Sequence, residues 1–139
     1  MWYTDSMEYK VMMTRLVDSL MKTLKIGSEF SKVPRGRYRS DGNASGERFR
    51  EDFLRKRLTL LSSGEKLRIV IDDDVEGYGS SFLVEGFAGM VKYGYMQAAE
   101  LLGKIEINYT NPDFEFYKKK IEQYINEAKF NSKSYEPNN

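Results

Sequence analysis

The side chains best suited to chemistry lie in one arginine-rich stretch, RGRYRSDGNASGERFRED, at residues 35–52. Residues 32–57 hold nine basic and four acidic side chains, an excess of five positive charges. Glycine and small polar residues let a backbone approach an anion, and a helix N-terminus offers free N–H groups to it. Arginine adds forked donors for a phosphate or carboxylate. The stretch therefore predicts an anion-binding loop with six candidate residues: Arg37, Arg39, Ser45, Gly46, Arg48 and Arg50.

A run of three aspartates, Asp72, Asp73 and Asp74, follows a compact β-branched segment at residues 67–71. Carboxylates at the C-terminal end of a strand can hold Mg²⁺. The alternative is a polar strand end whose side chains make turn hydrogen bonds. We favour the alternative, because a phosphoaspartate-type site also needs a lysine and a hydroxyl at later strand ends, and residues 108–110 do not supply that pair. The arginines of the first stretch would then either bind an external anion or pair with this aspartate run.

Two adjacent serines, Ser80 and Ser81, follow a glycine-rich turn and precede a segment with helical spacing of apolar residues. We expect at least one of them to cap that helix. A phosphate added there would interact favourably with the helix dipole and could pair with arginines. The serines are therefore candidates for a modification or interaction site.

The residues that the chain lacks narrow its chemistry. The sequence holds no cysteine and no histidine, which excludes disulfides, thiolate or imidazole metal sites and histidine-based triads. We expect no cofactor and no catalytic residue. The net charge of +1 makes nucleic acid an unlikely partner. No apolar window approaches 18 residues and no signal peptide opens the chain, so we expect a cytoplasmic location without a membrane partner.

Hydrophobic periodicity predicts alternating helices and strands. A helix is expected over residues 9–24, with a strand as its rival, followed by an extended edge piece at 29–39. A second helix over 46–61 begins at a cap supplied by Asn43 or Ser45. Further along the chain we expect these elements: a central strand at 67–71, a helix from Ser80 to Tyr95 with a weaker continuation to Leu102, a strand at 104–109, and a last helix capped by Asn111 and Pro112.

This order predicts the α/β class, with a single small mixed sheet flanked by helices. We divide the chain into an N-terminal helical extension at residues 1–24, one α/β domain at 25–130 and a polar, frayed tail at 131–139.

Two motifs carry a family resemblance: GRYRSDGNASGERFRED, and SSFLVEGFAG from Ser80 onward, which includes Glu85. Across residues 25–109 the sequence resembles a bacterial and phage family of STAS-like domains of unassigned function, distantly similar to anti-sigma factor antagonists. The resemblance implies a STAS-like fold. In the antagonists a partner kinase phosphorylates a serine in an Asp-Ser-Ser-Gly stretch at a helix start. Ser81 is the closer match to that serine, although Gly79 and Phe82 depart from the pattern.

The resemblance implies a non-enzymatic regulatory module that binds a partner protein, such as a kinase-like ATPase, through Ser80, Ser81, Glu85 and the arginine loop. A second copy of the chain is a further candidate partner. The alternative is a nucleotide- or phosphate-binding protein or a small Mg²⁺-dependent enzyme, in which the arginines clamp phosphates and the aspartates hold the metal. A phage inhibitor of a host defence system is a variant of the first interpretation.

Overall fold

The computed structural model describes residues 6–19 and 21–137 and has the α/β architecture that the sequence predicts. Its sheet has three strands in the order β1-β2-β3, and the central position of β2 confirms the prediction. Both pairings are parallel, so the expectation of a mixed sheet is wrong for the described strands. The strands are β1 (Met21–Lys25), β2 (Lys66–Val70) and β3 (Ile105–Asn108).

The sheet is parallel because helices fill both connections between its strands. Residues 29–39, expected as an extended edge piece, add no strand; the chain instead forms the short helix η1 (Ile26–Phe30) and then a loop. Residues 29–39 therefore do not pair with β1, and they connect β1 to the arginine-rich stretch.

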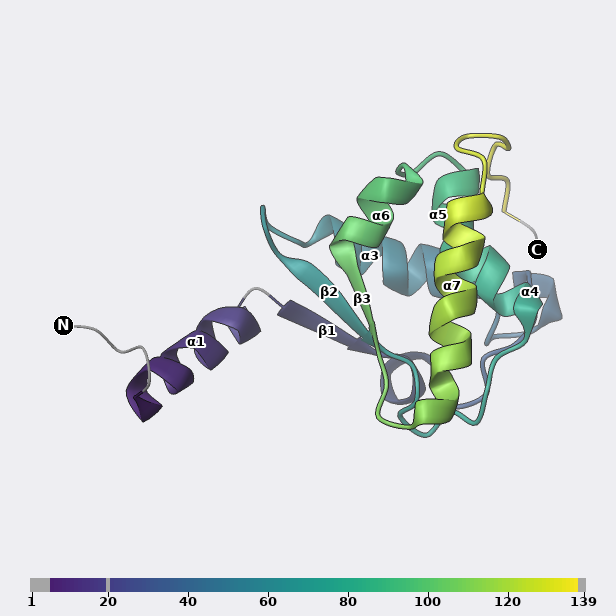
Figure 1. Ribbon diagram of the computed structural model, residues 1–139. Helices are drawn as coiled ribbons and strands as arrows, with labels where there is room; N and C mark the ends of the chain where they lie inside the picture. Colours follow the sequence, from purple (N-terminus) through teal and green to yellow (C-terminus); the bar gives the residue numbers. More distant parts are fainter. Residues whose placement is uncertain (1–5, 20, 138–139) are drawn as a thin grey trace.

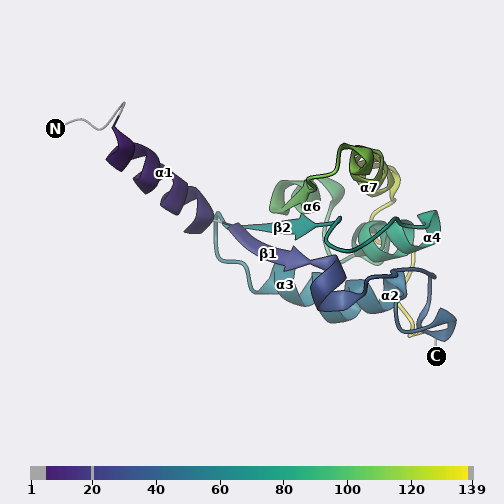
Figure 2. The ribbon, with the colours of Figure 1, turned by 90° about the horizontal axis from the view of Figure 1, so that it is seen from below.

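The apolar core lies on one face of this sheet, which carries the buried side chains of Leu24, Ile69 and Ile107. One continuous helical segment follows β1, and a second follows β2 and leads to α6, β3 and α7 (Figures 1 and 2). The first segment comprises α2 (Gly46–Arg48), η3 (Phe49–Leu54) and α3 (Arg55–Thr59). The second comprises α4 (Ser80–Leu83), η4 (Val84–Ala88) and α5 (Gly89–Lys92). Four further helices belong to the domain: η2 (Arg39–Asp41), α6 (Ala98–Lys104), η5 (Pro112–Phe114) and α7 (Glu115–Glu127).

The N-terminal helix α1 (Met7–Ser19) projects away from the rest of the molecule (Figure 1). The expected helix over residues 9–24 is thus correct in type but ends too late, since residues 21–24 belong to β1. The register with β2 explains the change: Met21 lies opposite Lys66, and Leu24, which is fully buried, lies opposite Ile69. Sheet pairing outweighs the helical spacing of these residues.

The core joins the sheet to both helical segments. On β2, Leu67 and Ile69 are fully buried and alternate with half-exposed residues, as expected for a strand with one face in the core. From the first helical segment, the ring of Phe49 lies 5.6 Å from that of Phe82 and 5.2 Å from that of Phe87 in the second. These tilted aromatic contacts add to the apolar burial that holds the two segments together.

Residues 131–135 pack against the body of the domain. Asn131 donates its backbone N–H to Val91 at 3.0 Å, and Lys133 donates to Lys92 at 3.2 Å. Further on, the Tyr135 hydroxyl donates to Glu47 at 2.6 Å. The expectation of a frayed tail is therefore wrong for these residues. The tail is polar, but Tyr135 contributes an aromatic ring that packs against Tyr93 and a hydroxyl that donates a hydrogen bond.

Candidate functional site

Ser80 and Ser81 are the first two residues of the continuous helical segment that runs from residue 80 to residue 92. Both side chains are exposed, and neither hydroxyl forms a hydrogen bond with the described part of the chain. The N-cap position belongs to Gly79, in an extended conformation with φ −80° and ψ 151°. The expectation that a serine caps this helix is therefore wrong, and the two hydroxyls remain available for modification or contact.

Glu85, expected to be an interaction residue, is instead buried one turn further along the same helical segment, with 2% of its surface exposed. One carboxylate oxygen accepts hydrogen bonds from Arg50 and from the Tyr93 hydroxyl, both at 2.7 Å. Burial and the hydrogen bond to Glu85 both raise the pKa of Tyr93. Glu85 thus faces the interior and cannot contact a partner directly.

Arg50, an anion-binding candidate, is fully buried and is the partner of Glu85. Nη1 also donates to the Glu85 backbone carbonyl at 2.7 Å, and Nε donates to Glu51 at 2.8 Å. The guanidinium lies close to the rings of both Tyr93 and Tyr135, 4.5 and 5.0 Å from their centroids. Burial acts to lower the pKa of Arg50, but the hydrogen bonds with Glu51 and Glu85 outweigh it, so the side chain stays charged. Arg50 therefore ties the two sequence motifs together inside the molecule.

Arg39 and Arg48 are also engaged within their own stretch. Arg39 forms a forked pair with Asp52, with both N–O distances at 2.9 Å. The hydrogen bond from Arg39 outweighs burial and lowers the pKa of the Asp52 carboxyl. Arg48 donates to the Asn43 carbonyl at 2.6 Å, and its guanidinium lies 5.2 Å from the ring centre of Phe30. The expected pairing of these arginines with the aspartate run is wrong: their partners lie in the arginine-rich stretch itself.

Ser45 and Gly46 build the helix start at which an anion was expected. Ser45 is the N-cap, as one of the two alternatives predicted, and its buried hydroxyl accepts from the Arg48 N–H at 3.2 Å. Gly46 packs directly against the helical segment that begins at Ser80. A Cβ on Gly46 would lie 2.7 Å from the Phe82 carbonyl oxygen and 2.9 Å from the Gly86 nitrogen. Both residues are therefore covered by protein.

Two arginines of the stretch, Arg35 and Arg37, have no ion-pair partner among the described residues. Their backbone follows the segment that contacts the serine helix, since Arg35 donates to Ala44 and Glu47 donates to Arg37, both at 2.9 Å. Figures 1 and 2 place this loop and α4 at the same end of the molecule. Arg35 was not a candidate, although its place in the Arg-Gly-Arg run could have suggested it.

The aspartate run binds backbone amides. Asp72 accepts from the N–H groups of Thr110 and Asn111 at 2.7 and 2.8 Å. Burial acts to raise the pKa of Asp72, but the hydrogen bonds from Asn111 and Thr110 lower it below its ordinary value. Asp73 accepts from Gly27 at 2.9 Å and from Ser28 at 3.0 Å.

The third aspartate, Asp74, is exposed and lies 3.6 Å from Lys32. The three carboxylates thus point to different partners. No group of three or more acidic side chains within residues 6–19 and 21–137 could hold a metal ion. This geometry fits the turn interpretation of the run.

The site as a whole is an exposed serine pair at a helix start in a small α/β domain, and Ser45, Arg50 and Glu85 of the two motifs are buried. A scan against protein-family models and searches of curated proteins and of solved structures find no significant match to this chain. In the part of the chain that the structure describes, no helix has the length and apolar character needed to cross a membrane.

Proposed function

We propose that the protein is a STAS-like, non-enzymatic regulatory module that binds a partner protein through the helix start at Ser80 and Ser81 and the adjacent arginine loop. Phosphorylation of one of these serines switches the binding. The partner is a kinase-like ATPase, as the family resemblance implies. An inhibitor of a host defence system is one form that such a module can take.

One observation carries this proposal: some polar side chains of the two motifs are exposed and form no bond with described residues, whereas others are buried and bonded to each other. The hydroxyls of Ser80 and Ser81 are exposed and unbonded to described residues, while Glu85 on the same helix is bonded to Arg50 in the interior. A rigid helix with an accessible end suits recognition, because little ordering of the backbone is needed when a partner binds.

A phosphate at this place would change the surface strongly. The γ-phosphoryl group of ATP would pass to the serine oxygen, the hydroxyl proton would leave, and ADP would be released. The product carries about −2 charge at pH 7 next to the positive end of a helix. Arg35 and Arg37, which have no ion-pair partner among the described residues, belong to the loop that leads into the helix packed against this segment. Phosphorylation would thus leave the fold intact while changing the charge of the surface that a partner binds.

The alternative, a nucleotide-binding protein or Mg²⁺-dependent enzyme, has weaker support. Arg39, Arg48 and Arg50 already have partners within the chain. Asp72 and Asp73 accept hydrogen bonds from backbone amides. A phosphate ligand would therefore have to be held by Arg35 and Arg37 without a companion metal site.

The test compares single Ala variants of Ser80 and Ser81 with the natural chain. The chain is isolated from its own cells, its intact mass is measured for an added phosphoryl group, and bound proteins are recovered with it. We expect phosphate on one of the two serines. In the Ala variant of that serine, partner binding should no longer change with the phosphorylation state of the chain. Absence of phosphate from both serines, together with unchanged partner binding by both variants, would refute the proposal.

Ser63 offers a matched control. It is another exposed serine, but it precedes the N-terminal end of β2, whereas Ser80 follows the C-terminal end of the same strand. Ser63→Ala should leave both the phosphate content and partner recovery unchanged. A loss of binding in this control as well would indicate a general effect on the protein.

A further inference from the structure

Helix α1 carries an unusual share of exposed apolar surface. Four of its large apolar side chains are between 41% and 74% exposed: Met7, Val11, Met12 and Leu16. The helix has 13 residues and projects from the body of the molecule (Figure 1). Isolated helices of this length are only marginally stable in water, because tertiary packing supplies most helical stability in proteins. A contact outside the domain would therefore stabilise α1.

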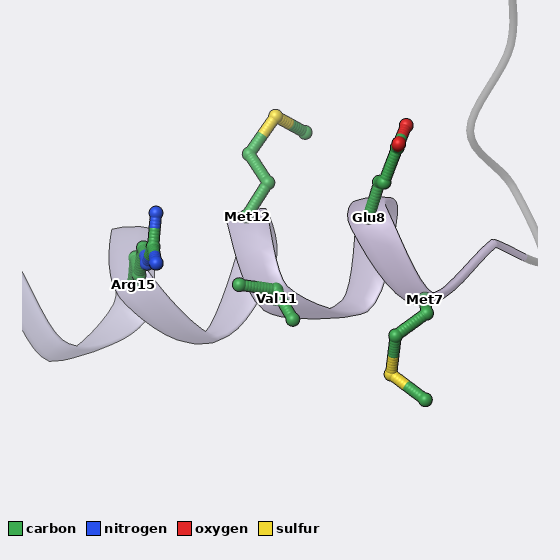
Figure 3. A pocket seen from close by; sticks show the side chains of 5 residues that line it. All are labelled: Met7, Glu8, Val11, Met12 and Arg15. Carbon is green, nitrogen blue, oxygen red and sulfur yellow. The ribbon is translucent and has the colours of Figure 1, made fainter.

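One face of α1 combines two apolar residues with two opposite charges. Val11, Met12, Glu8 and Arg15 line, with Met7, an open hollow of about 400 Å³ (Figure 3). Glu8 and Arg15 have no ion-pair partner within residues 6–19 and 21–137. Since these two residues are seven positions apart, two helical turns separate them and they share this face. Val11 and Met12 occupy the positions midway between them.

This arrangement is complementary to itself in one orientation. If a second copy of α1 lies antiparallel, with the crossing point between Val11 and Met12, Glu8 of each copy faces Arg15 of the other. The two ion pairs then flank a small apolar contact formed by Val11 and Met12 of both copies. A parallel copy would place Glu8 against Glu8 and Arg15 against Arg15, which is unfavourable. A two-fold interface requires such a self-complementary patch.

We propose that this face of α1 binds a second copy of the chain as an antiparallel helix pair. The inference is independent of the serine site. The other exposed element near the N-terminus, the outer edge of β1, is already closed: the Thr23 carbonyl accepts from Arg57 at 3.1 Å, and the Lys25 N–H donates to Glu29 at 2.7 Å. Sheet extension is thereby blocked at these residues.

The size of α1 sets the strength of this association. A helix of 13 residues is about 20 Å long, so a single helix pair buries less than the roughly 1,600 Å² of a standard protein interface. We therefore expect a weak, concentration-dependent dimer in which the two charge pairs decide the orientation.

The experiment measures sedimentation velocity of the full chain over a wide range of concentrations. The natural chain is expected to shift from monomer toward dimer as concentration rises. Arg15→Glu should weaken dimerisation roughly tenfold or more, because both Glu8 contacts become repulsive. Lys10→Glu is the matched control: it makes the same charge reversal on α1 at a residue outside the proposed face, and it should leave dimerisation nearly unchanged.

Mixing two charge variants tests whether charges pair across the interface. Glu8→Arg and Arg15→Glu should each be monomeric alone, because like charges meet at both contacts. Their mixture should form a heterodimer, since the two contacts between unlike variants are again attractive. A natural chain that stays monomeric at every concentration, or a mixture that fails to restore dimers, would overturn the proposal. In either case this face would have to meet another protein or another part of its own chain.

Discussion

The interior around Arg50 and the surface of α1 use the same kinds of residue in opposite ways. Arg50 and Glu85 are buried, lie 2.7 Å apart and are surrounded by tyrosine side chains. Glu8 and Arg15 on α1 have no ion-pair partner among the described residues and lie beside exposed apolar groups. Charges bonded within the chain maintain the architecture, whereas unbonded charges beside apolar surface are available to another molecule. Changes in the first region should therefore alter stability, and changes in the second should alter association.

The largest effect is expected from Glu85→Gln, which removes the negative charge facing Arg50 but keeps the side-chain size. The buried guanidinium then keeps Glu51 as its remaining anionic partner, and we expect a loss of about 3 kcal/mol in the free energy of unfolding. Urea denaturation measures this loss. Glu76→Gln, a change at an exposed glutamate, is the control and should stay within about 0.5 kcal/mol of the natural chain.

A double variant sharpens the same test. If the cost of losing Glu85 is mainly the stranded charge of Arg50, Arg50→Met combined with Glu85→Gln should be less destabilised than the two single changes added together. Simple addition of the two losses would mean that the pair is not coupled.

Gly46→Ala should have the next largest effect, because this glycine brings the arginine-rich stretch against the serine helix. The new methyl group would meet the Phe82 carbonyl and the Gly86 nitrogen, both backbone atoms that cannot turn away. We expect a loss of about 1–3 kcal/mol in thermal or urea unfolding. Gly103→Ala is the control: nothing lies within 4 Å of a Cβ there, and α6 should gain up to about 1 kcal/mol.

Local signals in the sequence predicted the elements that local chemistry determines. Ser45 caps α2, and Asn111 followed by Pro112 starts η5, because these residue types satisfy free helix amides on their own. The compact apolar segment at residues 67–71 similarly predicted the central strand β2. Each of these depends on residues within a few positions of one another.

Long-range partners could not be derived in this way. The contact of Arg50 with Glu85 joins positions 35 residues apart, and that of Tyr135 with Glu47 joins positions 88 apart. The sequence shows that Arg50 carries a charge. It does not show that the buried carboxylate of Glu85, in the helical segment after β2, compensates this charge. The site predicted from the sequence therefore included buried residues such as Arg50 and Glu85, whose residue types suit binding but whose side chains are inside the domain. It omitted Arg35, whose side chain is exposed.

A smaller effect is expected at Asp72, and it depends on pH. Hydrogen bonds from Asn111 and Thr110 outweigh burial and lower the pKa of this carboxyl. A group whose pKa is lower in the folded state stabilises the fold above its unfolded pKa of about 3.9 and loses that contribution as pH falls through the folded value. Asp72→Asn should therefore reduce stability by about 1 kcal/mol at pH 7 and show a shallower loss of stability below pH 4.

Urea unfolding at pH 7 and at pH 3 measures this difference. Asp74→Asn is the control, because Asp74 is exposed and its ion pair among the described residues is an exposed one with Lys32. We expect almost no change in stability at either pH for that variant. Equal acid sensitivity of the natural chain and Asp72→Asn would contradict the assignment of the carboxylate to the strand-end amides.

The smallest effect on stability should come from Arg37→Ala, and its value lies in the contrast with Arg39→Ala. Arg39 loses a forked, half-exposed pair with Asp52, at a cost of about 1 kcal/mol. Arg37 has no such pair among the described residues, so its removal should change the free energy of unfolding by less than about 0.5 kcal/mol. If the unpaired arginines serve the partner, Arg37→Ala should nevertheless slow association and reduce its salt dependence, because exposed charges act mainly on encounter rates. If Arg37→Ala lowers the free energy of unfolding but leaves the association rate unchanged, Arg37 has a structural role like that of Arg39. It would then not belong to the surface that binds the partner.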